Sequence, residues 1–231
     1  MLFLDAQTEQ RHNAAMVTQQ FIYALDLVGV AAFAFSGAIS GLKRRPDPIG
    51  LVIVAGATAI GGGMVRDVIL QRPWVILWDV NYLLIVVAAA IITFCFPTQL
   101  SRNKKVVMYF DAVALGVFSA IGTALAWELA QQHGGVKWSG GVNPLSILVI
   151  AGLTGAGGGI IRDLLLARVP LLLYREIYLL AVLVGAAALM IVRHLGASEG
   201  TGFAAAWLLT TLIRVLAIRY GLSLPRVGSG S

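Results

Sequence analysis

Two glycine triplets, each separated by two residues from an Arg-Asp pair, lie inside strongly apolar stretches of the chain. One copy reads AGATAIGGGMVRDVIL from Ala55, and the other reads AGLTGAGGGIIRDLLL from Ala151, a shift of 96 residues. Oxygen atoms of backbone carbonyls and carboxylates are the groups with which proteins contact hard cations. The repeated motif therefore predicts a duplicated chain whose two copies contact ions or a small polar substrate.

The triplets are the candidate constriction of a pathway, and their members are Gly61, Gly62, Gly63, Gly157, Gly158 and Gly159. Glycine in a helix interior costs about 1 kcal/mol relative to alanine, and its permissive backbone allows a kink or break. A break would present backbone carbonyls to cations between the repeats. The alternative is close helix–helix packing, for which membrane proteins also use small residues. Two symmetric copies favour the break.

The two arginines are expensive residues for an apolar segment, because an Arg near the membrane centre costs at least about 2.5–3.5 kcal/mol. Neighbouring residues of a helix point about 100° apart, so we expect each Arg to bind an acid on another helix. Helix rise places Asp26 level with Arg66, and Asp111 level with Arg162. We predict these two ion pairs, one in each vestibule. Static ion bridges that only fasten the helices are the alternative.

Asp67 and Asp163 follow the arginines, where the dipole of a second half-helix would favour an acid. Thr58 and Thr154 lie three residues before the triplets. Their hydroxyls can line a pore or bond to an upstream carbonyl and bend the helix. Both interpretations stay open for these four residues.

Tyr82 and Tyr178 also recur at the shift of 96 residues, early in two apolar segments. They can belong to the interfacial aromatic belt or face the pathway. Arg214 lies near the end of the last segment, so we expect its side chain to snorkel to the interface and assign it no function.

Composition defines the class of protein that must position these residues. The 231-residue chain is 58% hydrophobic and 12% charged, and its mean hydropathy is +0.85. A soluble domain carries about 25% charged residues, so we predict an all-α polytopic membrane protein. The net charge of +6 is typical of basic membrane loops, and no nucleic-acid partner is expected. No nucleophile–base constellation, P-loop or Cys/His cluster occurs, so we predict neither an enzyme nor a bound cofactor or metal.

Seven segments are long and apolar enough to span a bilayer, which needs about 20 residues. A polar N-terminal tail, residues 1–20, precedes them, and residues 223–231 are expected to be a flexible end. The predicted spans are Phe21–Leu42, Pro48–Gln71, Val80–Phe96, Val106–Ala130, Pro144–Arg168, Glu176–Val192 and Gly202–Tyr220.

The duplication extends beyond the glycine motif. Asp26, Phe33 and Gly37 return as Asp111, Phe118 and Gly122 at a shift of 85. Spans one to three therefore form one repeat, residues 21–100, and spans four to six form the second, residues 101–196. Because three is odd, the second repeat enters the membrane from the opposite face, and the repeats are inverted, as in many transporters. The seventh span, within 197–222, lies outside both repeats.

Basic residues predict the orientation, because cytoplasmic loops carry the excess of Lys and Arg. One face holds four of them: Arg11, Arg72, Lys137 and Arg193. The other holds ten: Lys43, Arg44, Arg45, Arg102, Lys104, Lys105, Arg168, Arg175, Arg219 and Arg226. The N-terminus is then outside and the C-terminus is cytoplasmic.

Seven spans, an inverted three-plus-three repeat and two GGGxxRD motifs resemble the bacterial and archaeal branch of the trimeric intracellular cation (TRIC) channel family. The resemblance covers residues 21–220 and rests on GGGMVRD from Gly61 and GAGGGIIRD from Gly155. It implies a homotrimer in the plasma (inner) membrane of a prokaryote, with one pore in each protomer. It also implies conduction of monovalent cations, potassium modestly preferred over sodium, through a constriction where the second and fifth spans bend at their glycines.

The same family is also described as a putative group of glycine transporters, so two functions follow from the resemblance. A carrier needs a closed site with a complete shell around its substrate, whereas a channel needs weak, multiple cation contacts. Few polar groups are available at the midplane, which favours a potassium-permeable channel. Secondary transport of glycine or another small amino acid is the alternative, since half-helix N-termini can hold a carboxylate.

Overall fold

The computed structural model describes residues 2–101, 104–139, 141–173 and 177–222, and this part of the chain is helical, without a named strand. The α-helices are α1 (Leu2–Gly41), α2 (Pro48–Ile69), α3 (Val80–Cys95), α4 (Pro97–Ser101), α5 (Lys104–Gln132), α6 (Pro144–Leu165), α7 (Ile177–His194) and α8 (Glu199–Tyr220). Short 3-10 turns are η1 (Leu42–Arg44), η2 (Val75–Leu77) and η3 (Leu171–Leu173). Six helices are long and apolar enough to cross a membrane, and α3 is a shorter apolar helix. These seven correspond to the seven predicted spans.

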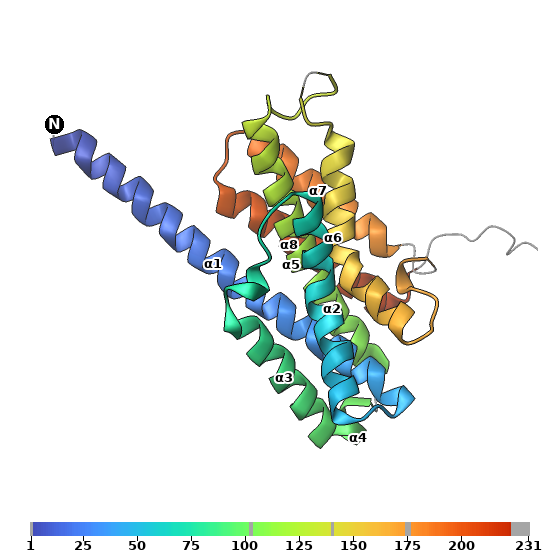
Figure 1. Cartoon of the computed structure of the whole chain (residues 1–231). Helices are drawn as coiled ribbons and strands as arrows, with labels where there is room; N and C mark the ends of the chain where they lie inside the picture. The colour runs from blue at the N-terminus through green and yellow to red at the C-terminus, as the bar shows by residue number, and fades with distance from the viewer. Residues whose placement is uncertain (1, 102–103, 140, 174–176, 223–231) are drawn as a thin grey trace, which may run out of the picture.

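The first helix is longer than its apolar part. The stretch expected as a polar tail is helical from Leu2 and continues without interruption into the membrane span. The apolar part of this helix, which is the candidate span, begins at Met16. Figure 1 shows this N-terminal half of α1 projecting away from the other helices. The C-terminal end expected over residues 223–231 lies outside the described residues.

The central helices α2 and α6 begin and end in the same way, which follows from the duplication. Asp47 and Asn143 are their N-caps, each accepting a hydrogen bond from a backbone N–H of the first turn, and a proline follows each cap. Proline at the first helical position is favourable because its missing N–H has no intrahelical partner there. After the helices, Gln71 and Ala167 both take the left-handed conformation, at φ of 52° and 51°.

The two repeats pack around the contact between α2 and α6 (Figure 1). Helix α1 lies against α2, α3 and α5, and α5 lies against α6, α7 and α8. The equivalent residues Phe33 and Phe118 stack on one another, with ring centroids 5.3 Å apart. This pair joins the same position of the two inverted repeats. Helix α8 adds a layer over α5 and α7 that the first repeat lacks.

The helix break expected at the glycine triplets is absent from both helices, whereas a kink without a break stays a prediction. Every residue of α2 from Pro48 to Ile69 and of α6 from Pro144 to Leu165 is α-helical. An unbroken helix keeps the backbone hydrogen bonds satisfied in an apolar surrounding, where each unpaired group is costly. The triplets have a different structural use, which is seen at the contact between the two helices.

Candidate functional site

The glycine triplets lie where α2 and α6 meet backbone to backbone. A Cβ atom on Gly62 would lie 2.5 Å from the carbonyl oxygen of Thr154 and 3.1 Å from the amide nitrogen of Gly158. A Cβ on Gly158 would in turn collide with the carbonyl oxygen of Thr58, and one on Gly157 would lie 2.9 Å from the Cα of Gly62. The first two glycines of each triplet therefore allow the two central helices to touch, which is the packing role that small residues have in membranes.

The third glycine of each triplet faces a polar cluster instead. A Cβ on Gly159 would lie 3.2 Å from the Tyr178 hydroxyl and 3.4 Å from Asp111 Oδ1. Gly63 lines a cavity, and a Cβ there would come no closer than 3.7 Å to the Arg66 guanidinium. The triplets thus combine a packing position with a position beside charged groups.

The two threonines bond within their own helices and pack against glycines of the outer helices. Thr58 donates to the carbonyl of Val54 at 2.6 Å, and Thr154 donates to the carbonyl of Ile150 at 2.7 Å. This is the bond to an upstream carbonyl that was one of the two interpretations. Both residues are fully buried. Gly37 and Gly122 make room for them, since a Cβ at these positions would lie 2.5 Å and 2.6 Å from the threonine hydroxyls.

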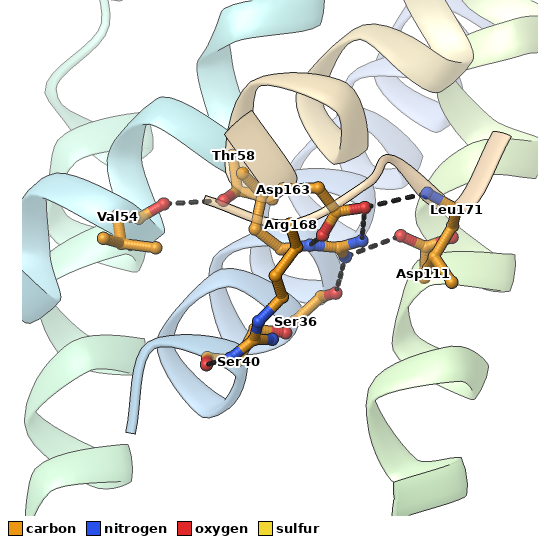
Figure 2. A network of polar contacts seen from close by, with 9 residues as sticks. Ser36, Ser40, Val54, Thr58, Asp111, Asp163, Arg168 and Leu171 are labelled. Carbon is orange, nitrogen blue, oxygen red and sulfur yellow. Dashed lines mark hydrogen bonds and ion pairs between the residues drawn. The ribbon is translucent and has the colours of Figure 1, made fainter. Parts of the chain in front are cut away.

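The second repeat carries a buried ion-pair network, the Asp111 site. Within the described residues, the second carboxylate oxygen of Asp111, Oδ2, is buried and accepts no hydrogen bond. Arg162 donates through Nη1 to Asp111 Oδ1 at 2.8 Å, which confirms the predicted pair. The same Nη1 donates to the hydroxyl of Ser36 at 2.7 Å, and Asp163 accepts from the backbone N–H of Leu171 at 3.0 Å (Figure 2). Arg162 is 1% exposed and Asp111 is 0% exposed. Buried charges of this kind are stable only when paired and hydrogen-bonded.

Each arginine also binds the aspartate that follows it, contrary to the expectation. Arg66 Nε lies 2.7 Å from Asp67 Oδ1, and Arg162 Nε lies 2.9 Å from Asp163 Oδ1. The 100° between adjacent Cα–Cβ directions does not prevent this contact, because the long arginine side chain can turn sideways around the helix and present its Nε.

The first repeat carries the equivalent Asp26 site, and its contacts differ. Asp26 accepts a hydrogen bond from the Tyr82 hydroxyl at 2.5 Å, so the predicted ion pair with Arg66 is wrong as a direct bond. Asp26 and Arg66 instead line the same cavity of about 30 Å³, together with Asp67, Gly63 and Trp74 among others. Within the described residues, Asp26 Oδ1 is buried and accepts no hydrogen bond. An unpaired buried carboxylate oxygen beside a cavity is suited to a cation.

Three further polar side chains lie near Asp26. Tyr23 lies one turn away on α1, and Asp79 and Asn81 lie at the start of α3. The Tyr23 hydroxyl donates to Asp79 at 2.5 Å and accepts from the Asn81 amide at 2.9 Å. The hydrogen bond from Tyr23 lowers the pKa of the Asp79 carboxyl, and the backbone N–H of Asn81 acts in the same direction. Asp79 therefore stays ionised throughout the neutral pH range and adds a negative charge near the Asp26 site.

The repeated tyrosines belong to the two sites and not to an aromatic belt. Tyr82 and Tyr178 are both buried. Arg214 lies over the Tyr178 ring, with its Cζ atom 4.7 Å from the centroid. The expectation that Arg214 snorkels is wrong, since it is 3% exposed. Little in the sequence points to Ser36, which is a single small hydroxyl in an apolar helix. Arg214, in contrast, could have been recognised as a buried site residue, because it is a charged residue within an otherwise apolar span.

The arrangement can bind cations and offers little covalent chemistry. The Asp26 site contains two acidic side chains, Asp26 and Asp67, and one cationic side chain, Arg66. Their formal charges add up to −1. The Asp111 site balances two acids with Arg162 and Arg214. In the part of the chain that the structure describes, no group of three or more His, Cys, Asp or Glu side chains forms a metal cluster.

Comparison with known families gives a match over most of the chain. A family model described as "Glycine transporter" matches residues 23–98 and 108–194. A UPF0126 membrane protein of Deinococcus radiodurans is 36% identical over 170 residues, which are 72% of this chain and 74% of the relative. The UPF0126 inner membrane protein YadS of Escherichia coli K12 is 33% identical over 207 residues, 88% of this chain and 95% of YadS.

Solved structures with the same fold are described as TRIC channels. One, a prokaryotic TRIC channel crystallised in 0.5 M KCl, has a TM-score of 0.79 and 31% identity, covering 89% of this chain and 100% of the solved one. The TRIC trimeric intracellular cation channel orthologue from Rhodobacter sphaeroides has a TM-score of 0.76 and 30% identity, covering 87% of this chain and 99% of its own. The duplicated glycine contact and the two aspartate sites are thus features of a chain with channel relatives.

Proposed function

Because this chain belongs to the prokaryotic TRIC channel family, whose family model carries the description of a glycine transporter, we propose that it is a potassium-permeable cation channel. Each protomer of a homotrimer has its own path, which runs from the Asp26 site past the α2–α6 contact to the Asp111 site. The permeant ions are potassium and sodium, and no other cofactor is needed.

The buried, unpaired Oδ1 of Asp26 beside the small cavity is the observation that carries the proposal. The cavity is lined by a carboxylate pair, a tyrosine hydroxyl and the backbone of Gly63. A few weak oxygen contacts allow a cation to enter and leave again, which conduction requires. Asp79 adds a second negative charge near this site, and a concentration of one sign of charge raises the local concentration of cations.

The triplet glycines are proposed as the narrowest part of the path. Gly61 and Gly157 are the first members of the triplets, and the third members, Gly63 and Gly159, face the two aspartate sites. Thr58 and Thr154 lie one turn earlier and hold their hydroxyls on backbone carbonyls. The path would widen when α2 and α6 move apart at their glycine contact. The distance between the two helices at these glycines would therefore set the diameter of the path.

The protein is a multi-pass membrane protein, and we propose that the Asp111 end faces the cytoplasm. Lys43, Arg44, Arg45 and Arg168 lie at the ends of α1 and α6 beside this site. A surplus of basic residues marks the cytoplasmic side of short loops. Trimer formation and a location in the inner membrane are carried over from the relatives, with membrane lipids as the other partner.

The test uses liposomes loaded with potassium that contain the purified protein. An ion electrode measures potassium efflux when the outside salt holds only a large impermeant cation, and the same liposomes are offered labelled glycine. The proposal expects efflux that scales with the amount of protein, and glycine uptake no faster than in protein-free liposomes. Saturable glycine uptake without potassium efflux would replace the channel by the carrier.

A further inference from the structure

The two ends of the protein can be compared contact by contact, because the repeats are inverted copies. A shift of 85 residues relates α1 to α5, as Asp26 relates to Asp111, and a shift of 96 relates α2 to α6, as Gly62 relates to Gly158. Every contact between α1 and the end of α6 therefore has a counterpart between α5 and the end of α2. Where the two contacts differ, the protein is asymmetric.

Three arginines join α1 to the end of α6, and we call these contacts the α1–α6 latch. Arg162 donates to the Ser36 hydroxyl at 2.7 Å, and Arg168 donates to the carbonyl of Ser40 at 3.2 Å (Figure 2). Arg44 donates to the carbonyl of Leu166 through Nη2 at 2.6 Å and through Nε at 3.1 Å. Charge-assisted bonds to the last carbonyls of a helix are among the stronger hydrogen bonds of a protein.

The counterpart of the innermost latch contact cannot form. Arg66 corresponds to Arg162, and the residue that corresponds to Ser36 is Ile121, which has no hydrogen-bonding side chain. Arg66 forms an ion pair with Asp67 and lines the cavity that Asp26 also lines.

The counterparts of the two outer contacts line open space. Arg72 corresponds to Arg168 and Leu125 to Ser40, and both line a pocket of about 220 Å³. Leu129 replaces Arg44, and with Leu70, the counterpart of Leu166, it lines a pocket of about 570 Å³. One end of the molecule is therefore fastened at the three positions where the other end is hollow.

We propose that the α1–α6 latch is a gate, and that Arg162 occupies the Asp111 carboxylate in place of a permeant cation while the gate is closed. This inference rests on the proposed channel function. The Asp26 site serves as the pattern for the open state, in which the arginine binds only its neighbouring aspartate and the tyrosine hydroxyl donates to the carboxylate. Tyr178 already lies beside Gly159 and Asp111, in the place from which Tyr82 reaches Asp26.

The first test removes an exposed part of the latch. Arg44→Gln deletes the bonds to Leu166, and Lys43→Gln is the matched control, because Lys43 is an exposed neighbour of the same charge. Single-channel recording in planar bilayers measures the ratio of open to closed time. Loss of charge-assisted bonds in the closed state should raise this ratio about tenfold or more. The unitary conductance should stay unchanged, since Arg44 is outside the path.

The second test works inside the latch and at the opposite end. Ser36→Ala should raise the open-to-closed ratio, whereas Ser119→Ala should not, because the buried Ser119 hydroxyl bonds only within its own helix, to Gly116. Leu129→Arg copies Arg44 into the hollow end and should lower the ratio. If Ser36→Ala fails to assemble, judged by gel filtration, Arg44→Gln and Leu129→Arg decide the matter.

The outcomes separate the gate from the channel. A wild type that carries no cation current overturns the proposed function and the gate with it. A conducting wild type whose ratio is the same in Arg44→Gln, Lys43→Gln and Leu129→Arg overturns the gate alone. Opposite shifts in Arg44→Gln and Leu129→Arg support the gate.

Discussion

At the scale of residues, Asp26 and Asp111 are one position of the repeat in two environments. One oxygen of each carboxylate, Asp26 Oδ1 and Asp111 Oδ2, accepts no hydrogen bond within the described residues. Asp111 is ion-paired with Arg162 through its other oxygen, whereas Asp26 accepts one hydrogen bond from Tyr82 and lies beside a cavity. A buried ion pair neutralises its own field, so its attraction for other ions is small. The difference makes Asp26 the stronger candidate for contact with a cation.

We predict that Asp26→Asn lowers the unitary potassium conductance. The expected factor is about fivefold, corresponding to about 1 kcal/mol for a hydrated cation about 4 Å away at the dielectric constant of water. Asp47→Asn is the matched control, since Asp47 is an exposed N-cap and asparagine caps a helix equally well. Equal conductance of the two variants in planar bilayers would remove Asp26 from the path.

The sequence predicted part of this site. The partner of Arg162 followed from depth along the helices, because regular helix rise places Asp111 level with it. The bonds to Asp67 and Asp163 did not follow, because they depend on how a flexible side chain turns. Ser36 could not be found either, since its contact joins α1 to α6, and the packing of these helices is not encoded in the spacing of either one.

At the scale of elements, the glycine triplets are contact surfaces of two intact helices. Gly62 and Gly158 meet the opposite backbone, whereas Gly63 lies beside an open cavity. The apolar pattern predicted that these helices begin at Pro48 and Pro144. The pattern did not predict that the helices stay unbroken, since the same glycines serve a break or a close contact, and the choice depends on the partner helix.

We predict that Gly158→Ala destabilises the protein and that Gly63→Ala does not. The added methyl group at Gly158 collides with the carbonyl of Thr58, and forced overpacking costs about 1–3 kcal/mol. Gly63 is the control position, because it has room for a methyl group. Thermal unfolding of the detergent-solubilised variants, followed by circular dichroism, measures the difference. Similar melting temperatures would show that the helices can separate at the triplet without loss.

At the scale of the whole molecule, the protein is an inverted duplication that has become asymmetric. The odd number of spans in each repeat predicted the inversion from the sequence. The glycine transporter family model covers both repeats. The extra span, α8, was predicted as well, but the burial of Arg214 and the latch between the repeats required the structure. An asymmetric pair of inverted repeats is the arrangement from which one end can open while the other is closed.

We predict a homotrimer. Native mass spectrometry of the protein released from detergent should give three times the chain mass of 24.5 kDa. Large apolar side chains such as Ile53, Val149 and Leu208 are exposed on the single chain. Contact with lipid or with other protomers would cover these surfaces. A monomer that conducts with the same unitary conductance would show that assembly is not required for the path.

Whether the protein conducts cations can be measured by single-channel recording with a gradient of potassium chloride across a planar bilayer. A potassium-permeable channel should give discrete currents that reverse close to the potassium equilibrium potential, and the reversal potential should shift slightly when sodium replaces potassium on one side. Reversal at the chloride potential would contradict cation conduction. So would silence from protein that takes up glycine when reconstituted in liposomes.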